Sequence, residues 1–91
     1  MACAGCGTRK PGEAEQHELY RAIQEGEAQQ DGAATAGSPY VSPLEAARTI
    51  CEASRSICKA AKRSREADAK ARCREAEAKC DAAMGAATGG V

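Results

Sequence analysis

Two pairs of cysteines in the last third of the chain constrain its fold most strongly. Cys51 and Cys58 are seven residues apart, and so are Cys73 and Cys80. Seven residues make about two turns of an α-helix, so each pair lies on one helix face. The pairs are also placed symmetrically about one point, which sets Cys51 opposite Cys80 and Cys58 opposite Cys73 in antiparallel helices. The sequence therefore predicts an all-α fold, a helical hairpin with two nested disulfides.

Helix geometry argues against the other pairings of these four cysteines. A bond between Cys51 and Cys58 would have to bridge ~10.5 Å along one helix, beyond the reach of a disulfide. The crossed pairing would require parallel helices after a short return loop. Small residues along the seam allow the helices to approach to the Cα separation of about 5.5–6 Å that a disulfide needs. The predicted seam sets Leu44, Ala47, Cys51, Ser54, Cys58 and Ala61 against Ala69, Cys73, Ala76, Cys80, Ala83 and Ala87.

The composition gives this chain a physical need for covalent bonds. Its 91 residues include no Phe and no Trp, so few large side chains are present to build a core. Closing the segment between Cys58 and Cys73 would stabilise the fold by about 3 kcal/mol in the chain-entropy description. Six cysteines in so short a chain are typical of an oxidising compartment. The chain contains no apolar run long enough to span a membrane.

Local signals divide the chain into five segments. We predict a flexible cysteine-containing segment at 1–12, a helix at 13–30, a linker at 31–41, the stapled hairpin at 42–84 and a flexible tail at 85–91.

The hairpin has clear start and turn signals. Ser42 is a predicted N-cap, Pro43 suits the first helical position, and Glu45 completes a capping box. The turn is expected near Arg63, with Ser64 as the cap of the second helix.

The acidic helix at 13–30 is a candidate third helix. Its apolar patch includes Leu19 and Ile23, which we expect to meet Ile50 and Ile57 on the hairpin. Gly26 is expected to weaken its last turns.

The N-terminal cysteines leave several interpretations open. Cys3 and Cys6 have the spacing of a redox pair, but no strand precedes them, and a zinc site would lack its second pair of ligands. Ala2-Cys3-Ala4-Gly5 is similar to the end of a bacterial lipobox, which would make Cys3 a lipidation site and a membrane tether. Alternatively, Cys3 and Cys6 form a third disulfide.

Basic residues gather near the predicted hairpin tip. Lys62, Arg63 and Arg65 are candidate anion-binding residues there. No aromatic side chain is interleaved to stack on bases, which argues against nucleic acid as the partner. His17, the only histidine, has no nucleophile or second histidine near it in the sequence, and we expect it to be solvated. Because the sequence shows no acid–base pair and no nucleophile with a partner, we expect that the protein is not an enzyme.

A thiol-based metal or redox protein is the principal alternative for Cys51, Cys58, Cys73 and Cys80. Thiolates favour Cu(I) and Zn²⁺, and cysteine-bearing helical bundles that hold Cu(I) are similar in a general way. The two cysteine levels lie ~10.5 Å apart along the axis, too far for one tetrahedral zinc ion. We therefore assign no metal and no cofactor from the sequence.

The stapled hairpin, its Ser-Pro-x-Glu cap and the Ala-Cys start together resemble small cysteine-rich lipoproteins of high-GC bacteria, of the myxobacterial type. The resemblance covers mainly residues 40–83. It implies an envelope location, periplasmic, outer-membrane-associated or secreted, and brings no activity. The sequence thus predicts a non-enzymatic structural or protein-interaction module, with metal or redox chemistry and polyanion binding as alternatives.

Overall fold

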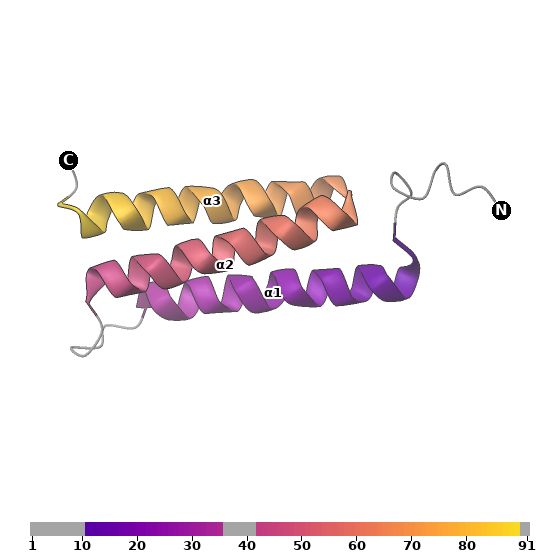
Figure 1. Cartoon of the computed structure of the whole chain (residues 1–91), viewed down its shortest axis with the longest axis horizontal. Coiled ribbons are helices and arrows are strands. Elements are labelled where there is room, and N and C mark those ends of the chain that lie inside the picture. Colours follow the sequence, from indigo (N-terminus) through magenta and orange to yellow (C-terminus); the bar gives the residue numbers. More distant parts are fainter. Residues whose placement is uncertain (1–10, 36–41, 90–91) are drawn as a thin grey trace.

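Three helices make up the fold. The structure is a computed structural model that describes residues 11–35 and 42–89. The helices are α1 (Glu13–Thr35), α2 (Pro43–Ser64) and α3 (Ala67–Ala87), and no strand occurs in these two ranges. Consecutive helices run antiparallel, and α2 lies beside both of the others (Figure 1). The predicted all-α hairpin with a third helix is confirmed.

The start of α2 follows the predicted capping signal. The Ser42 hydroxyl accepts a hydrogen bond from the Glu45 backbone N–H at 3.1 Å, and Pro43 is the first helical residue. The Ser42 hydroxyl thus pairs with a backbone N–H that the start of a helix would otherwise leave unpaired, and Pro43 has no N–H that needs a partner.

Two helices extend beyond their predicted ends. α1 continues past Gln30 to Thr35, into the segment predicted as linker, and α3 continues through Gly85 to Ala87. Tertiary contacts extend α1, because Gln30 is buried and the Asp31 carboxylate lies 3.7 Å from the Lys79 amine. Local propensity alone places the boundary too early here.

The turn between α2 and α3 differs from its predicted form. Arg65 has a φ of 64°, and its N–H donates to the Ala61 carbonyl, which ends α2. Glu66, not Ser64, is the N-cap residue of α3. Ser64 is buried within α2, where its hydroxyl donates to Gln16 Oε1 at 2.7 Å. Gln16 Nε2 donates in return to the Ser64 carbonyl at 3.1 Å, which joins the start of α1 to the hairpin tip.

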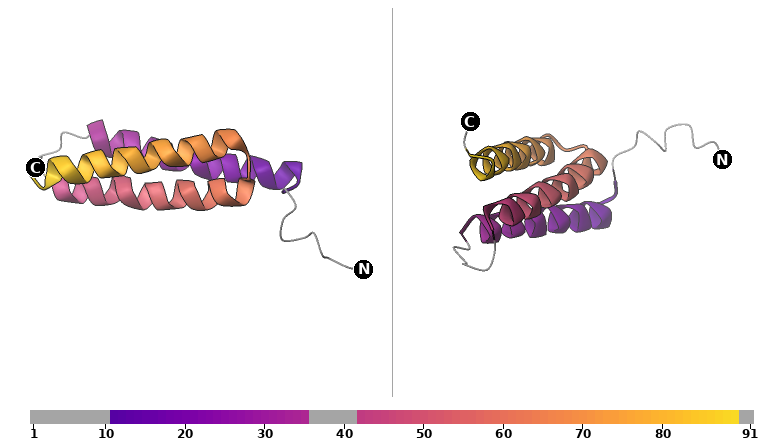
Figure 2. Two further views of the ribbon diagram at one scale, coloured as in Figure 1. Left: turned by 90° about the horizontal axis from the view of Figure 1, so that it is seen from above. Right: turned by 60° about the vertical axis from the view of Figure 1, so that its left-hand side comes forward.

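Helix α1 packs against α2 through a small apolar cluster. The buried cluster joins Ile23 of α1 to Ile57, Ala60, Ala61, Ala69 and Ala76, with Leu19 packed against it. The two further views in Figure 2 show α1 alongside α2. The expected meeting of α1 with Ile57 therefore occurs, whereas Ile50 is buried outside this cluster.

Gly26 is buried where α1 packs closely against α2. A Cβ atom at this position would lie 2.5 Å from Cγ1 and 3.0 Å from Cδ1 of Ile57. Ile57 is fully buried, so its side chain has little room to move. The helix continues through Gly26, and the residue allows packing where we expected it to weaken the helix.

Gln30 is a buried polar residue that connects all three helices. Only 1% of it is exposed, and its Nε2 donates to the Ile50 carbonyl of α2 at 3.0 Å and to the Ala76 carbonyl of α3 at 3.1 Å. Its Oε1 atom is buried without a hydrogen-bond partner among the described residues. The two hydrogen bonds from Nε2 therefore fix the register of α1 on the hairpin. Burying the unpaired Oε1 costs free energy, which reduces the net stabilisation of the fold by Gln30.

We expect Gln30→Ala to lower the free energy of unfolding by about 2–3 kcal/mol. The variant loses two buried hydrogen bonds and leaves a cavity at the three-helix junction. Urea denaturation followed by circular dichroism measures the change. Gln29→Ala is the matched control, because Gln29 is the exposed neighbour and its replacement should change stability by less than about 0.5 kcal/mol. Equal effects of the two substitutions would contradict the role of Gln30.

Candidate functional site

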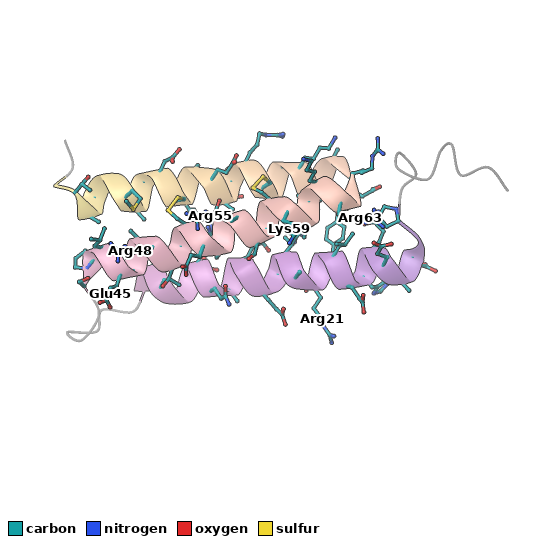
Figure 3. The ribbon with its side chains drawn as sticks, viewed as in Figure 1. Arg21, Glu45, Arg48, Arg55, Lys59 and Arg63 are labelled. Atoms are coloured by element: carbon teal, nitrogen blue, oxygen red, sulfur yellow. A yellow bond between two sulfur atoms is a disulfide. The ribbon has the colours of Figure 1, made fainter. Side chains whose placement is uncertain are left out.

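Both disulfides occur as predicted. Cys51 is bonded to Cys80 and Cys58 to Cys73, and each pair has a Cα–Cα distance of 4.6 Å. This distance is shorter than expected, and the small residues at the interface between α2 and α3 explain it. The small buried residues there are Ala47, Ser54, Ala61, Ala69 and Ala76. Figure 3 shows the two bridges between α2 and α3.

The predicted seam is correct at its centre and differs at its open end. Ala47 and Ala61 are buried, as a seam position requires. Leu44 is 38% exposed and is the large hydrophobic residue that the described chain leaves most open to solvent. It lies in the first turn of α2, where Pro43 and Glu45 are exposed as well, so this turn contributes little to the core.

A shallow depression lies over the outer disulfide. It has a volume of about 410 Å³ and is lined by Cys51, Ser54, Arg55, Glu77, Cys80 and Asp81. These residues come from α2 and α3 alone, so the depression opens on the side of the hairpin that α1 does not cover.

Helix α1 neutralises part of the basic cluster predicted at the tip. Arg63 donates to the Glu15 carboxylate at 2.7 Å, and this hydrogen bond, together with the charge of Glu15, raises the pKa of Arg63. Arg72 lies 3.3 Å from a Glu27 oxygen, and its guanidinium is 5.5 Å from the centre of the Tyr20 ring.

A second group of cations makes no ion pair with any described residue. These exposed residues are Arg55, Lys59 and Lys62 of α2 with Lys70 and Arg74 of α3. We call the surface formed by these five residues and the outer sides of the two disulfides the disulfide face. Figure 3 shows Arg55 and Lys59 on the same stretch of α2.

The structure thus separates the three residues predicted to bind anions. Lys62 belongs to the disulfide face, Arg63 is held by Glu15, and Arg65 forms the left-handed residue of the turn. Lys59, Lys70 and Arg74 were not among the predicted anion-binding residues, although they belong to the disulfide face. Lys59 lies three residues before Lys62, and Lys70 lies four residues before Arg74, so each pair lies on one face of its helix. This spacing is the sequence signal that could have grouped them.

One group of side chains has the spacing of metal ligands. The sulfur atoms of Cys58 and Cys73 and a carboxylate oxygen of Glu77 lie within 4.8 Å of one another. Both sulfurs are bonded in a disulfide, however, and a cysteine sulfur binds zinc or Cu(I) strongly only as a free thiolate. This group could hold a metal only after reduction of the inner disulfide.

A surface groove lies along the first half of α1. It has a volume of about 1000 Å³, and most of its lining residues are of charged or polar type, Glu13, Gln16, His17 and Arg21 among them. His17 is exposed there, as predicted, and makes no hydrogen bond to any part of the chain that the structure describes. The groove therefore contains no activated nucleophile within residues 11–35 and 42–89.

Several predictions concern residues outside the two described ranges. They are the lipidation of Cys3 and the bond between Cys3 and Cys6. Within the described ranges, no helix has both the length and the apolar character needed to span a membrane.

Comparisons with protein families, with curated proteins and with solved structures find no match for this chain.

Proposed function

We propose that this protein is a non-enzymatic helical scaffold of an oxidising compartment, whose exposed surface binds a partner. One observation carries the proposal: two nested disulfides, two helical turns apart, join α2 to α3. Disulfides persist in secreted and envelope proteins and are rare in a reducing cytosol. A bacterial envelope location, periplasmic, outer-membrane-associated or secreted, follows from this reasoning and from the resemblance to small lipoproteins, and Cys3 would be the tether.

The absence of a large core supports a scaffold with rigid surfaces. The buried apolar residues are mostly alanine, with Ile23, Ile50 and Ile57 as the largest ones. Such a core contributes little burial free energy, so the disulfides, the partly buried hydrogen bond of Gln16 and the buried ones of Gln30 hold the helices in register. A scaffold fixed in this way presents its surface charges in a constant arrangement.

A thiol-based metal protein is the rival function, and the group formed by Cys58, Cys73 and Glu77 is the observation that favours it. The rival requires these cysteines to be free thiols in the native compartment, whereas the scaffold requires them to be oxidised.

Cobalt titration distinguishes the two functions. The protein is isolated from its native compartment under conditions that trap thiols, and Co²⁺ is added before and after reduction of the disulfides. If the protein is a scaffold, the unreduced protein should show no thiolate-to-cobalt absorption, and adding Co²⁺ should not change its helix content. A stoichiometric cobalt complex with the untreated protein would overturn the scaffold proposal and favour the metal protein.

A further inference from the structure

The unpaired cations of the disulfide face are arranged as one flat array. Arg55, Lys59 and Lys62 are spaced by four and three residues, which places them on one side of α2 over ~10.5 Å of its length. Lys70 and Arg74 are one turn apart on the antiparallel helix α3. Two rows of long basic side chains therefore stand beside the disulfides. Glu77 and Asp81 continue the α3 row at spacings of three and four residues, so the cations are concentrated toward the tip of the hairpin and these two carboxylates lie toward the outer disulfide.

The opposite side of the hairpin has the opposite charge. Glu15 and Glu27 of α1 pair with Arg63 and Arg72, so α1 neutralises the cations on its own side. On α1 itself, Glu13, Glu18 and Glu25 are exposed. The formal net charge of the whole chain is zero, so carboxylates elsewhere, many of them on α1, balance the cations of the disulfide face. This uneven distribution favours binding of an anionic partner with the disulfide face toward it.

The shape of the face favours one class of anionic partner. It is formed by two helices lying side by side, and its depression is shallow, so it has neither a cleft for a polymer chain nor a protruding helix for a nucleic-acid groove. Tyr20, the aromatic residue within residues 11–35 and 42–89, lies under Arg72 on the α1 side and is not placed to stack on bases here. A flat array of lysines and arginines matches a planar layer of negatively charged headgroups.

We propose that the disulfide face docks the protein on an anionic phospholipid bilayer. This inference names the partner of the scaffold and rests on that proposed function. Lys59 lies in the middle of the α2 row and Lys62 at its end nearest the turn, and both side chains are exposed and would approach the headgroups directly. The disulfides hold α2 and α3 at a fixed spacing, so they keep the two rows of cations in one plane.

Vesicle binding tests the proposal. The oxidised full chain is mixed with vesicles of equal parts phosphatidylglycerol and phosphatidylcholine, and the bound fraction is measured by flotation. Each basic residue near such a surface contributes about fivefold in affinity, so Lys59→Gln with Lys62→Gln should weaken binding by about 30-fold. Glutamine keeps helix propensity and most of the side-chain length, and circular dichroism verifies that the variant is folded.

A second double variant supplies the matched control. Arg21→Gln with Lys79→Gln removes the same charge from the α1 side, where Lys79 pairs with Asp31, and should weaken binding by less than about threefold. Binding of the natural chain should also fall steeply between low and high salt and be absent with pure phosphatidylcholine.

Three results would overturn the lipid proposal: equal losses in the two double variants, equal binding to neutral vesicles, or tighter binding to a single-stranded oligonucleotide than to the anionic vesicles. None of these results bears on the disulfides, which are mapped separately, so failure of this inference and failure of the scaffold proposal are distinguishable.

Discussion

Replacing Cys58 and Cys73 by serine will lower the free energy of unfolding by about 3 kcal/mol, and reducing both disulfides will unfold the hairpin. The inner bond joins residues 15 positions apart, and a closed loop of this size removes about that much chain entropy from the unfolded state. Small domains have total stabilities of only about 5–15 kcal/mol, so the loss of one bond is a large fraction of the total. The mainly alanine core gives the reduced chain little apolar burial to replace it.

Chemical denaturation measures both effects. The unfolding midpoint of the Cys58→Ser, Cys73→Ser variant is compared with that of the natural chain and with that of Ser56→Ala, an exposed change on the same helix. Ser56→Ala should shift the free energy of unfolding by less than about 0.5 kcal/mol. If the double serine variant and the fully reduced protein both unfold at the natural midpoint, the disulfides do not stabilise the fold.

Gly26→Ala should destabilise the protein although alanine is the better helix former. The added methyl group would lie 2.5 Å from Ile57 Cγ1, and Ile57 is too deeply buried to yield freely. Overpacking of this kind costs about 1–3 kcal/mol, which exceeds the gain of about 1 kcal/mol in helix propensity. We therefore expect a net loss of up to about 2 kcal/mol, with α1 displaced from α2.

Gly32→Ala is the matched control for this prediction. Gly32 lies in the same helix, and a Cβ atom there would meet nothing within 4 Å. The change should therefore stabilise the protein by up to about 1 kcal/mol. Thermal unfolding of the two variants gives the comparison. Stabilisation by both substitutions would show that α1 does not approach α2 closely at Gly26.

The hairpin could be predicted from the sequence because its signals are local or strictly periodic. The symmetric spacing of Cys51, Cys58, Cys73 and Cys80 indicates both the antiparallel arrangement and the disulfide pairing. The cap at Ser42 could be predicted because a helix start depends on a few adjacent residues.

The position of α1 depends on contacts that are far apart in the sequence. Gln30 lies seven residues after Ile23 on the same helix face, so its burial was indicated by periodicity, but a glutamine at that position favours no packing by itself. Its partners, Ile50 and Ala76, offer only backbone carbonyls, which no sequence pattern marks. Ser64 was similarly assigned to a cap, because its partner Gln16 lies 48 residues away.

The charged surface could be predicted in composition but not in arrangement. The sequence indicated a basic tip, and the structure shows that α1 divides it into paired residues such as Arg63 and Arg72 and unpaired ones such as Lys62. That division follows from the side of α2 on which α1 packs, which is set by Ile57 and Gly26. The candidate site is thus a consequence of tertiary packing.

Peptide mapping without reduction tests the central claim, the nested pairing of the cysteines, most directly. Trypsin cleaves after lysine and arginine, so each of the four hairpin cysteines falls in its own peptide: 49–55, 56–59, 73–74 or 80–91. After alkylation of free thiols in the protein from its native compartment, mass spectrometry should find 49–55 bonded to 80–91 and 56–59 bonded to 73–74. Alkylated hairpin cysteines, or 49–55 bonded to 73–74, would contradict the stapled scaffold.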